Sequence, residues 1–520
     1  MFKLTDTELQ NAFEAICHHG YSTMLPQPYE WQFVVVKWPK VKAYLAQIDL
    51  DMYIPYKPMR VFAPKSRANI RVVHLLHPED LVIYTALILI VKNDIESARI
   101  SRKSRRVFSY RVDTSTPNRL YDARGAHDAY LGQLKAKAGK ASTKFVGLAD
   151  IADFYPRINQ HRLENVIQTT ASTQHGIDVA RVLVRKLISN LMERNSYGIP
   201  VGPYASRILG EAVLIDVDAF LKSNGIDYVR WVDDYNVFCR SEFLAQSALF
   251  ELAEWLFSNH GLTLQSAKTK ILPVPRFNDE VLSKPEESLT DRDHVLSLLR
   301  ETGLGGGYED EPDEEEVQTA LEDLQGYDLQ GMFVKSISDQ DLVDYKIVKY
   351  VLTRLPRIAG VDEDLKTNIL ELVIDNAQLL YPEAESIAKY VMSFTGFSKG
   401  QKKNISKKLL KPLKSKRNSP PDYYAMWILH IFSASEQWNQ VSDIIELYQR
   451  TNSEVVKRYA ALAIAVCGTR TEALIVKDDL PAAVDLLRLA VLSASNKLGD
   501  DERKHWKLAN QIHGIVEKIV

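Results

Sequence analysis

The chain of 520 residues has few features of a secreted, disulfide-bonded or membrane-spanning protein. It has three cysteines, at positions 17, 239 and 467, and no CxxC pair, so neither a disulfide framework nor a cysteine-ligated zinc site is expected. The longest apolar stretch, residues 81–91, is interrupted by a tyrosine and a threonine and is too short to cross a bilayer. The polar, amphipathic N-terminus does not resemble a signal peptide. These absences predict a soluble protein of a reducing compartment, without a membrane partner.

Neither sign of charge dominates, because 65 Lys and Arg residues oppose 67 Asp and Glu residues. That balance excludes a disordered polyion and a histone-like protein. With 46% hydrophobic residues, a chain of this length can bury roughly two to four separate cores.

The composition changes along the chain. Residues 1–150 contain 22 Lys and Arg against 14 Asp and Glu, whereas residues 305–316 join three glycines to an almost wholly acidic run. This Gly-rich, acidic segment predicts a flexible boundary between β-rich and helical parts. After it, apolar residues recur every three or four positions, which predicts helices at residues 344–355, 365–380, 423–432, 441–447, 455–466, 481–492 and 505–520. Stacked helix pairs of HEAT-like style are expected, without a repeat of fixed length.

Two segments bring acidic residues to strand ends. The run FVGLADIADFYP (residues 145–156) predicts a buried strand that ends at Asp150. The run YVRWVDDYNVFC (residues 228–239) predicts a hairpin with Asp233 and Asp234 at its tight turn. Three carboxylates brought together would repel one another unless divalent cations such as Mg²⁺ bound there, and a pair of such ions supports phosphoryl transfer. The alternative for the Asp pair alone is a cap on a surface turn.

Three further segments would complete a nucleotide site. Residues 60–73 predict a β-hairpin rich in cations that can clamp a triphosphate. Residues 197–209 (YGIPVGPYASRIL) predict a glycine- and proline-rich loop that leads into a helix over residues 206–221. Residues 261–271 predict a short strand leading to Lys268 and Lys270, either of which could protonate a leaving pyrophosphate. Taken singly, the loop could be a simple turn before a helix, and the two lysines could be solvated surface residues.

In this order the segments resemble the fingers and palm of reverse transcriptases, over about residues 55–275. The resemblance implies that Asp150, Asp233 and Asp234 hold two Mg²⁺ or Mn²⁺ ions, with Lys268 as a catalytic general acid. It implies nucleotide binding by Lys65, Arg67, Arg71, Tyr155, Pro200, Val201 and Gly202. Tyr155 matches the aromatic residue that blocks a ribose 2′-OH. The chain departs from the pattern at Trp231, where retroviral enzymes have Tyr, and at Val201, where many have a polar residue.

The whole layout, with DIADFYP, GIPVGPYASRIL and a helical C-terminal half, is similar to the abortive-infection (Abi) reverse transcriptases of bacterial antiphage defence. That resemblance implies untemplated DNA synthesis from dNTPs, primed by a protein tyrosine so that the single-stranded DNA product stays covalently attached. It also implies a homo-oligomer in the bacterial cytoplasm. The expected fold is an α+β, reverse-transcriptase-like part followed by an all-α, HEAT-like helical-repeat domain. Its expected divisions are a helical extension (1–54), fingers and palm (55–275), a linker with the acidic segment (276–316) and the helical-repeat domain (317–520).

The priming residue is not identified by the sequence. The N-terminal region offers Tyr21, Tyr29, Tyr44, Tyr53 and Tyr56, although most tyrosines are core or interface residues.

Two basic stretches are candidates for nucleic-acid contact. Residues 99–111 interleave cations with Phe108 and Tyr110, which favours binding of single strands. Residues 399–417 contain nine Lys and Arg and no acid; they are explained equally by phosphate contacts and by a solvated surface.

Two other functions stay open. The same active site could copy a dedicated RNA, as retron-type enzymes do. Alternatively, the helical half could be an interaction scaffold on an inactive polymerase fold, although three retained, mutually repelling aspartates argue against that.

Overall fold

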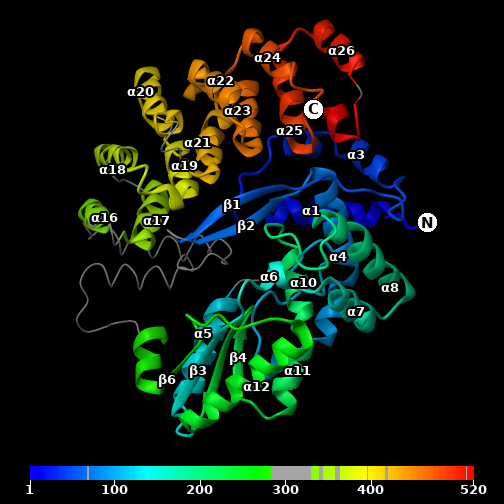
Figure 1. The fold of residues 1–520 in the computed structure, drawn as a ribbon, viewed down its shortest axis with the longest axis vertical. Helices are drawn as coiled ribbons and strands as arrows, with labels where there is room; N and C mark the ends of the chain where they lie inside the picture. Colours follow the sequence, from blue (N-terminus) through cyan, green and yellow to red (C-terminus); the bar gives the residue numbers. More distant parts are fainter. Residues whose placement is uncertain are drawn as a thin grey trace.

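The computed structural model of the chain combines a mixed α+β N-terminal part with an all-α C-terminal part (Figure 1). The acidic linker predicted at residues 305–316 and the predicted triphosphate-binding residue Arg67 lie outside the described residues. The structure describes residues 1–66, 69–122, 125–282, 329–338, 343–357, 363–394, 396–415, 420–510 and 512–520.

The N-terminal helices surround one long, buried helix. The apolar stretch at residues 81–91 becomes the middle of α4 (Pro78–Ala98), which packs against α1 and is buried over most of its length. A capping box between Thr5 and Glu8 begins α1, satisfying backbone N–H groups that would otherwise lack partners. The helices before α4 are α1 (Asp6–His19), α2 (Trp31–Val36) and α3 (Trp38–Leu45).

Within the part of the chain that the structure describes, no helix combines the length and the apolar character needed to cross a bilayer.

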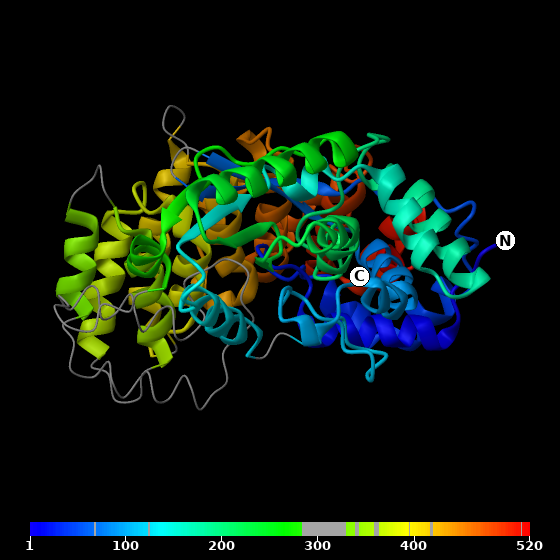
Figure 2. The ribbon, with the colours of Figure 1, turned by 90° about the horizontal axis from the view of Figure 1, so that it is seen from below.

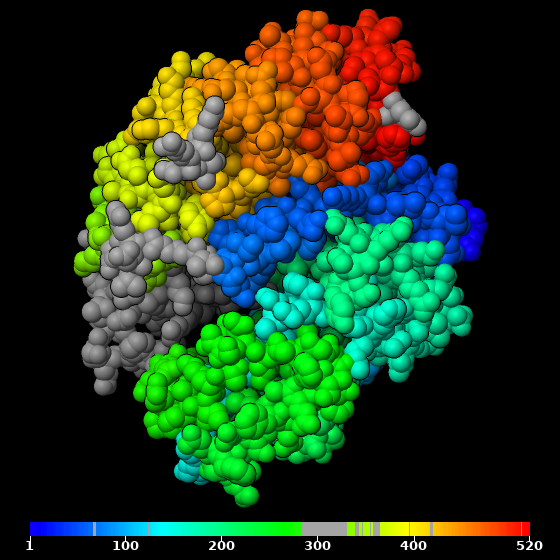
Figure 3. Space-filling view, in the orientation of Figure 1, coloured from blue at the N-terminus to red at the C-terminus, as the bar shows by residue number. Residues whose placement is uncertain are grey.

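The predicted cationic hairpin is confirmed. Strands β1 (Met59–Ser66) and β2 (Asn69–Leu75) form an antiparallel pair of their own. The hairpin lies across the molecule between the C-terminal helices and the four-stranded sheet, as the space-filling view shows (Figure 3). It contacts α21 and α23 of the C-terminal part, so the cations of the hairpin are held on a framework built from both halves of the chain.

The second sheet is antiparallel, with strand order β4-β5-β3-β6. Helix α12 (Glu242–His260) covers one face, where a Cβ on Gly147 would lie 3.2 Å from Leu249. Helix α5 (Ala126–Ala138) packs on the other face, over a small core that includes Val146 and Phe238. The strands are β3 (Phe145–Asp150), β4 (Tyr228–Trp231), β5 (Asp234–Cys239) and β6 (Lys270–Pro273).

Short helices connect the strands. The prediction of one continuous helix over residues 206–221 is wrong, because the helix breaks at Leu214 into α10 and α11. The break separates Glu211 from Asp218, and both carboxylates reach the same arginine, Arg230. The connecting helices are α6 (Phe154–Arg157), α7 (Gln160–Thr170), α8 (Gln174–Arg181), a π-helical segment (Val182–Ile188), α9 (Ser189–Leu191), α10 (Ser206–Val213), α11 (Ile215–Ser223) and α13 (Val274–Phe277).

The C-terminal part is a row of helices, as predicted. Helices α17, α19, α21, α23 and α25 pack one on the next, whereas HEAT-like repeats remain a prediction. Seen from below, α16 to α20 lie at one end of the molecule and the N-terminal helices at the other (Figure 2). The helices are α16 (Leu329–Ser338), α17 (Tyr345–Arg354), α18 (Glu363–Asp375), α19 (Ala384–Met392), α20 (Lys399–Leu410), α21 (Asp422–Ala434), α22 (Val441–Arg450), α23 (Glu454–Cys467), α24 (Arg470–Lys477), α25 (Asp485–Ala494), α26 (Asp500–Ala509) and α27 (Val516–Ile519).

Buried polar contacts join the two ends of the chain. Arg458 of α23 and Glu30 are both fully buried and are paired through two hydrogen bonds of 2.7 and 2.9 Å. The helix predicted over residues 505–520 is instead two helices, because the backbone becomes extended at Asn510, and Gly514, with φ of +60°, lies just before the second helix. The backbone N–H groups of Ile515 and Val516 then donate to Glu79 of α4.

Candidate metal and nucleotide site

Three carboxylates converge where β3, β5 and the β4–β5 turn meet. Asp150 ends β3 and pairs in register with Asp234, the first residue of β5, while Asp233 lies in the turn. One carboxylate oxygen from each of the three lies within 4.8 Å of the others. The predicted convergence of Asp150, Asp233 and Asp234 is confirmed, although Asp234 belongs to the strand rather than to the turn.

The turn that presents Asp233 has an uncommon backbone. Val232 has φ of +51°, a left-handed conformation that is unfavourable for a β-branched residue. Both of its backbone polar groups are bound: its N–H donates to Ser109 Oγ at 2.9 Å, and its carbonyl accepts from Arg230 Nη1 at 2.7 Å. The Asp233 carbonyl also accepts from the Ile151 N–H at 3.2 Å. These bonds hold the turn against the end of β3.

A buried ionic network supports this turn from behind. Arg230 is fully buried and donates two bonds to Asp218, at 3.0 and 2.6 Å, and one to Glu211 at 3.0 Å. Glu211 also accepts from Arg99 at 2.6 Å and contacts Ser109. We define Arg230, Asp218, Glu211, Arg99 and Ser109 as the turn-supporting network. Sequence reasoning missed it, although an arginine inside the apolar strand YVRW was a signal that a buried partner must exist.

Part of the basic stretch 99–111 is used inside the protein. Arg99 and Arg111 are buried and both pair with Glu96, at 2.9 and 3.2 Å. Tyr110 is buried as well. These three side chains do not face solvent, but other cations of the stretch are exposed, so its contact with single strands stays a prediction; the exposed cations are Arg102, Lys103 and Arg105.

The electrostatics of the carboxylates favour a cation. Burial and the nearby Asp150 raise the pKa of Asp233 to about 6. Loss of hydration, together with the charges of Asp233 and Asp150, raises the pKa of Asp234 above its ordinary value. Crowded carboxylate oxygens are the ligands of hard divalent cations, so the donor set fits Mg²⁺ or Mn²⁺.

Lys268 is in place beside the carboxylates, but on a different element from the one predicted. Its Nζ donates to Asp150 at 2.9 Å, and its side chain is 53% exposed. Loss of hydration lowers its pKa, but the bond to Asp150 and the three aspartate charges outweigh that effect and raise the pKa. Lys268 sits in a turn, which its own N–H closes by donating to the Gln265 carbonyl at 3.0 Å, and β6 begins two residues later. The Gln265 N–H fastens this turn to the Asp150 carbonyl at 2.7 Å. Lys270 pairs with Glu280 instead.

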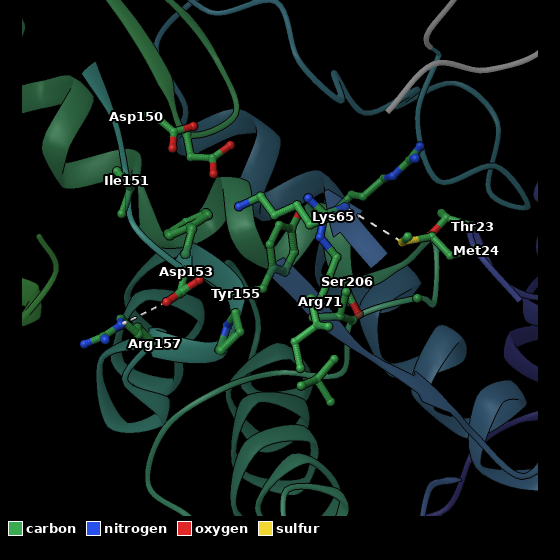
Figure 4. Close-up of a pocket in the computed structure, with 18 of the residues that line it drawn as sticks. Thr23, Met24, Lys65, Arg71, Asp150, Ile151, Asp153, Tyr155, Arg157 and Ser206 are labelled. Carbon is green, nitrogen blue, oxygen red and sulfur yellow. Dashed lines mark hydrogen bonds and ion pairs between the residues drawn. The ribbon is translucent and has the colours of Figure 1, made fainter. Parts of the chain in front are cut away.

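A cavity of about 560 Å³ opens from the carboxylates (Figure 4). Of the predicted nucleotide-binding residues, it is lined by Lys65, Arg71, Tyr155, Val201 and Gly202. It is also lined by residues that the sequence analysis did not single out, including Thr23, Met24, Asp153, Arg157, Ser206 and Arg207.

The loop of residues 197–205 is fastened to β2. His74 N–H donates to the Val201 carbonyl at 2.7 Å, and Val201 N–H donates to His74 Nδ1 at 3.2 Å. Gly202 has φ of +124°, and a Cβ there would lie 3.1 Å from the His74 carbonyl. Pro200 is absent from the cavity lining; its carbonyl accepts from Ser206 Oγ at 2.6 Å. Glycine at 202 therefore lets loop and hairpin form one wall.

Mg²⁺ affinity is expected to fall as the pH drops below about 8, because protons compete with the cation first for Asp234, whose pKa is raised to about 8, and then for Asp233, whose pKa is raised to about 6. The apparent Kd should rise about tenfold per pH unit while one proton is displaced, and more steeply below about 6, where two are. Calorimetric titration with Mg²⁺ across this range measures it. Asp153→Asn is the matched control, since Asp153 lies in the same cavity outside the carboxylate cluster. A wild-type affinity independent of pH would contradict the site.

Comparisons with known proteins add a distant likeness. No family model and no curated protein matches the chain. Two solved structures are similar at 12% identity: telomerase from Candida albicans in complex with a TWJ fragment of telomeric RNA, and apo telomerase from Candida tropicalis. The similarity to the first covers 82% of this chain and 70% of the telomerase chain, with a TM-score of 0.31. The similarity to the second covers 83% of this chain and 74% of the telomerase chain, with a TM-score of 0.32.

Proposed function

We propose that the chain is a DNA-synthesising nucleotidyltransferase of reverse-transcriptase type that uses dNTPs and two divalent ions. The observation that supports it most is the convergence of Asp150, Asp233 and Asp234 within 4.8 Å at one end of a cavity that also contains Lys65 and Arg71. Carboxylates beside cations in one cavity suit a metal-bound triphosphate.

Each residue then has a distinct task. The three aspartates would hold the Mg²⁺ or Mn²⁺ ions, which would supply charge stabilisation for hydroxyl attack on the α-phosphate and for the leaving pyrophosphate. Lys65 and Arg71 bind the triphosphate. Lys268, whose Nζ donates a hydrogen bond to Asp150, would transfer a proton to the leaving pyrophosphate as the general acid. Tyr155 excludes a ribose 2′-OH, and Val201 and Gly202, which line the cavity, contact the sugar and base.

The sequence resemblance to Abi reverse transcriptases extends this proposal. It adds synthesis without a template, priming by a tyrosine that keeps the DNA attached, a homo-oligomer and a role in abortive infection in the bacterial cytoplasm. The hydroxyls of two candidate primers are engaged: Tyr21 donates to the Leu76 carbonyl and Tyr53 to Asp80, both at 2.7 Å. Priming by either would require breaking that bond.

The experiment measures incorporation of radiolabelled dNTPs by the purified protein with Mg²⁺ or Mn²⁺, in one reaction without a template and in a second with an added RNA. We expect label that migrates with the protein on a denaturing gel and is released by protease as a DNA–peptide species. Label found solely on free DNA copied from an added RNA would favour the retron-like alternative. Metal binding without incorporation of any dNTP would contradict the proposal and favour the scaffold.

A further inference from the structure

The cavity has an end that the proposed chemistry leaves unused. Lys268 bonds to Asp150, and Lys65 and Arg71 lie across the same cavity from Asp150 in the close-up (Figure 4). The segment that follows α1 forms a further part of the wall, through Thr23 and Met24. In the close-up, Thr23 and Met24 lie beyond Lys65 and Arg71 as seen from Asp150 (Figure 4).

This N-terminal wall is built into the fold. Thr23 N–H donates to the Gly202 carbonyl at 3.1 Å, so the wall is bonded directly to the predicted nucleotide loop. Arg71 Nη1 lies 3.8 Å from Met24 Sδ. Tyr21 is buried and donates to the Leu76 carbonyl just beyond β2. The segment is thus fixed against the loop, the hairpin and the residue that follows β2.

The chemistry of this end suits a nucleobase. The negative charge of a triphosphate is balanced where the cations and a metal-bearing carboxylate cluster lie. The base of the same nucleotide would then occupy the far end of the cavity. There the wall offers a thioether, which packs well on aromatic faces, and the Thr23 hydroxyl, which can donate or accept a hydrogen bond.

We propose that Thr23 and Met24 form a base-contacting wall that sets which dNTP the protein prefers. The inference rests on the proposed function, and it assigns nucleotide selection to the N-terminal segment. Met24 packs on the base, and Thr23 distinguishes bases by its hydroxyl.

The test compares Met24→Ala, Met24→Leu and Thr23→Val with Met52→Ala, whose side chain is 79% exposed and outside the cavity. For each protein, kcat/KM is measured for the four dNTPs singly, and the affinity for each dNTP is measured by calorimetry. We expect Met24→Ala and Thr23→Val to change the ratios among dNTPs by about three- to tenfold. Met24→Leu should keep the wild-type ratios, as should Met52→Ala.

The outcomes separate the two proposals. If the wild type incorporates dNTPs and the ratios of Met24→Ala and Thr23→Val equal those of wild type, the wall has no role in selection and the proposed function stands. A uniform loss of kcat/KM for all four dNTPs would likewise show that the wall does not select among bases. If the wild type neither binds nor incorporates any dNTP, the proposed function fails and the inference fails with it.

Discussion

Asp233→Asn is expected to lower the rate of dNTP incorporation by about a thousandfold or more while the protein stays folded. The amide keeps the shape of the side chain but removes a charge from the cluster of three carboxylates. Catalysis at such a site is positioning and charge stabilisation, with no covalent contribution from the protein. The measurement is single-nucleotide incorporation at saturating Mg²⁺.

Stability provides the control for this variant. The fold raises the pKa of Asp233 to about 6, so ionisation of this carboxyl opposes folding. The protonated carboxyl favours the folded state at low pH, and this contribution to stability is lost as the pH rises through about 6. Asp233→Asn removes that penalty, so the metal-free variant should melt about 1–3 °C higher than wild type at pH 8. Mg²⁺ should raise the Tm of wild type more than that of the variant.

Asp153→Asn is the matched substitution for activity. Asp153 lines the same cavity, but its side chain is 66% exposed and lies about 4.0 Å from Arg157. Its loss should change incorporation by less than about threefold. Incorporation by Asp233→Asn at the wild-type rate would contradict the assignment of the metal ligands.

The central site could be predicted because its parts follow from local patterns. An apolar run ending at Asp150 and two β-rich runs around Asp233 specify strands and a turn without knowledge of the rest of the chain. Antiparallel pairing then places the end of β3 opposite the start of β5, where Asp150 and Asp234 are partners. The hairpin of β1 and β2 was predictable for the same reason.

The rest depends on contacts between distant segments. Thr23 reaches the cavity because its N–H bonds to Gly202, and no local pattern encodes that pairing. The charge pattern of residues 99–111 does not reveal that Arg99 and Arg111 point inward to Glu96. The turn that carries Lys268 is fastened to the end of β3 by the bond from the Gln265 N–H to the Asp150 carbonyl, which joins residues 115 apart in sequence and has no local signal.

Removing support from the catalytic turn should reduce activity strongly without touching a metal ligand. Arg230→Met keeps the unbranched apolar stem but removes the guanidinium, which leaves the Val232 carbonyl without this donor and Asp218 without its buried cation. Breaking one side of a buried ion pair costs about 3–5 kcal/mol, and a misplaced turn lowers kcat by about a hundredfold. The readout is kcat and KM for the preferred dNTP, together with the free energy of unfolding in urea.

Ser109→Ala separates positioning from simple loss of stability. Ser109 Oγ accepts from the Val232 N–H at 2.9 Å, and its loss should cost only about 1–2 kcal/mol. We expect kcat to fall about tenfold and the apparent Kd for Mg²⁺ to rise, while KM for the dNTP is unchanged, because the turn carries Asp233 and no nucleotide-wall residue. Arg276→Met is the control, since Arg276 is 67% exposed and pairs with Glu280 away from the carboxylates. A Ser109→Ala protein with wild-type kcat and Mg²⁺ dependence would show that the turn keeps its geometry without the Ser109 bond, because Arg230 would still donate to the Val232 carbonyl.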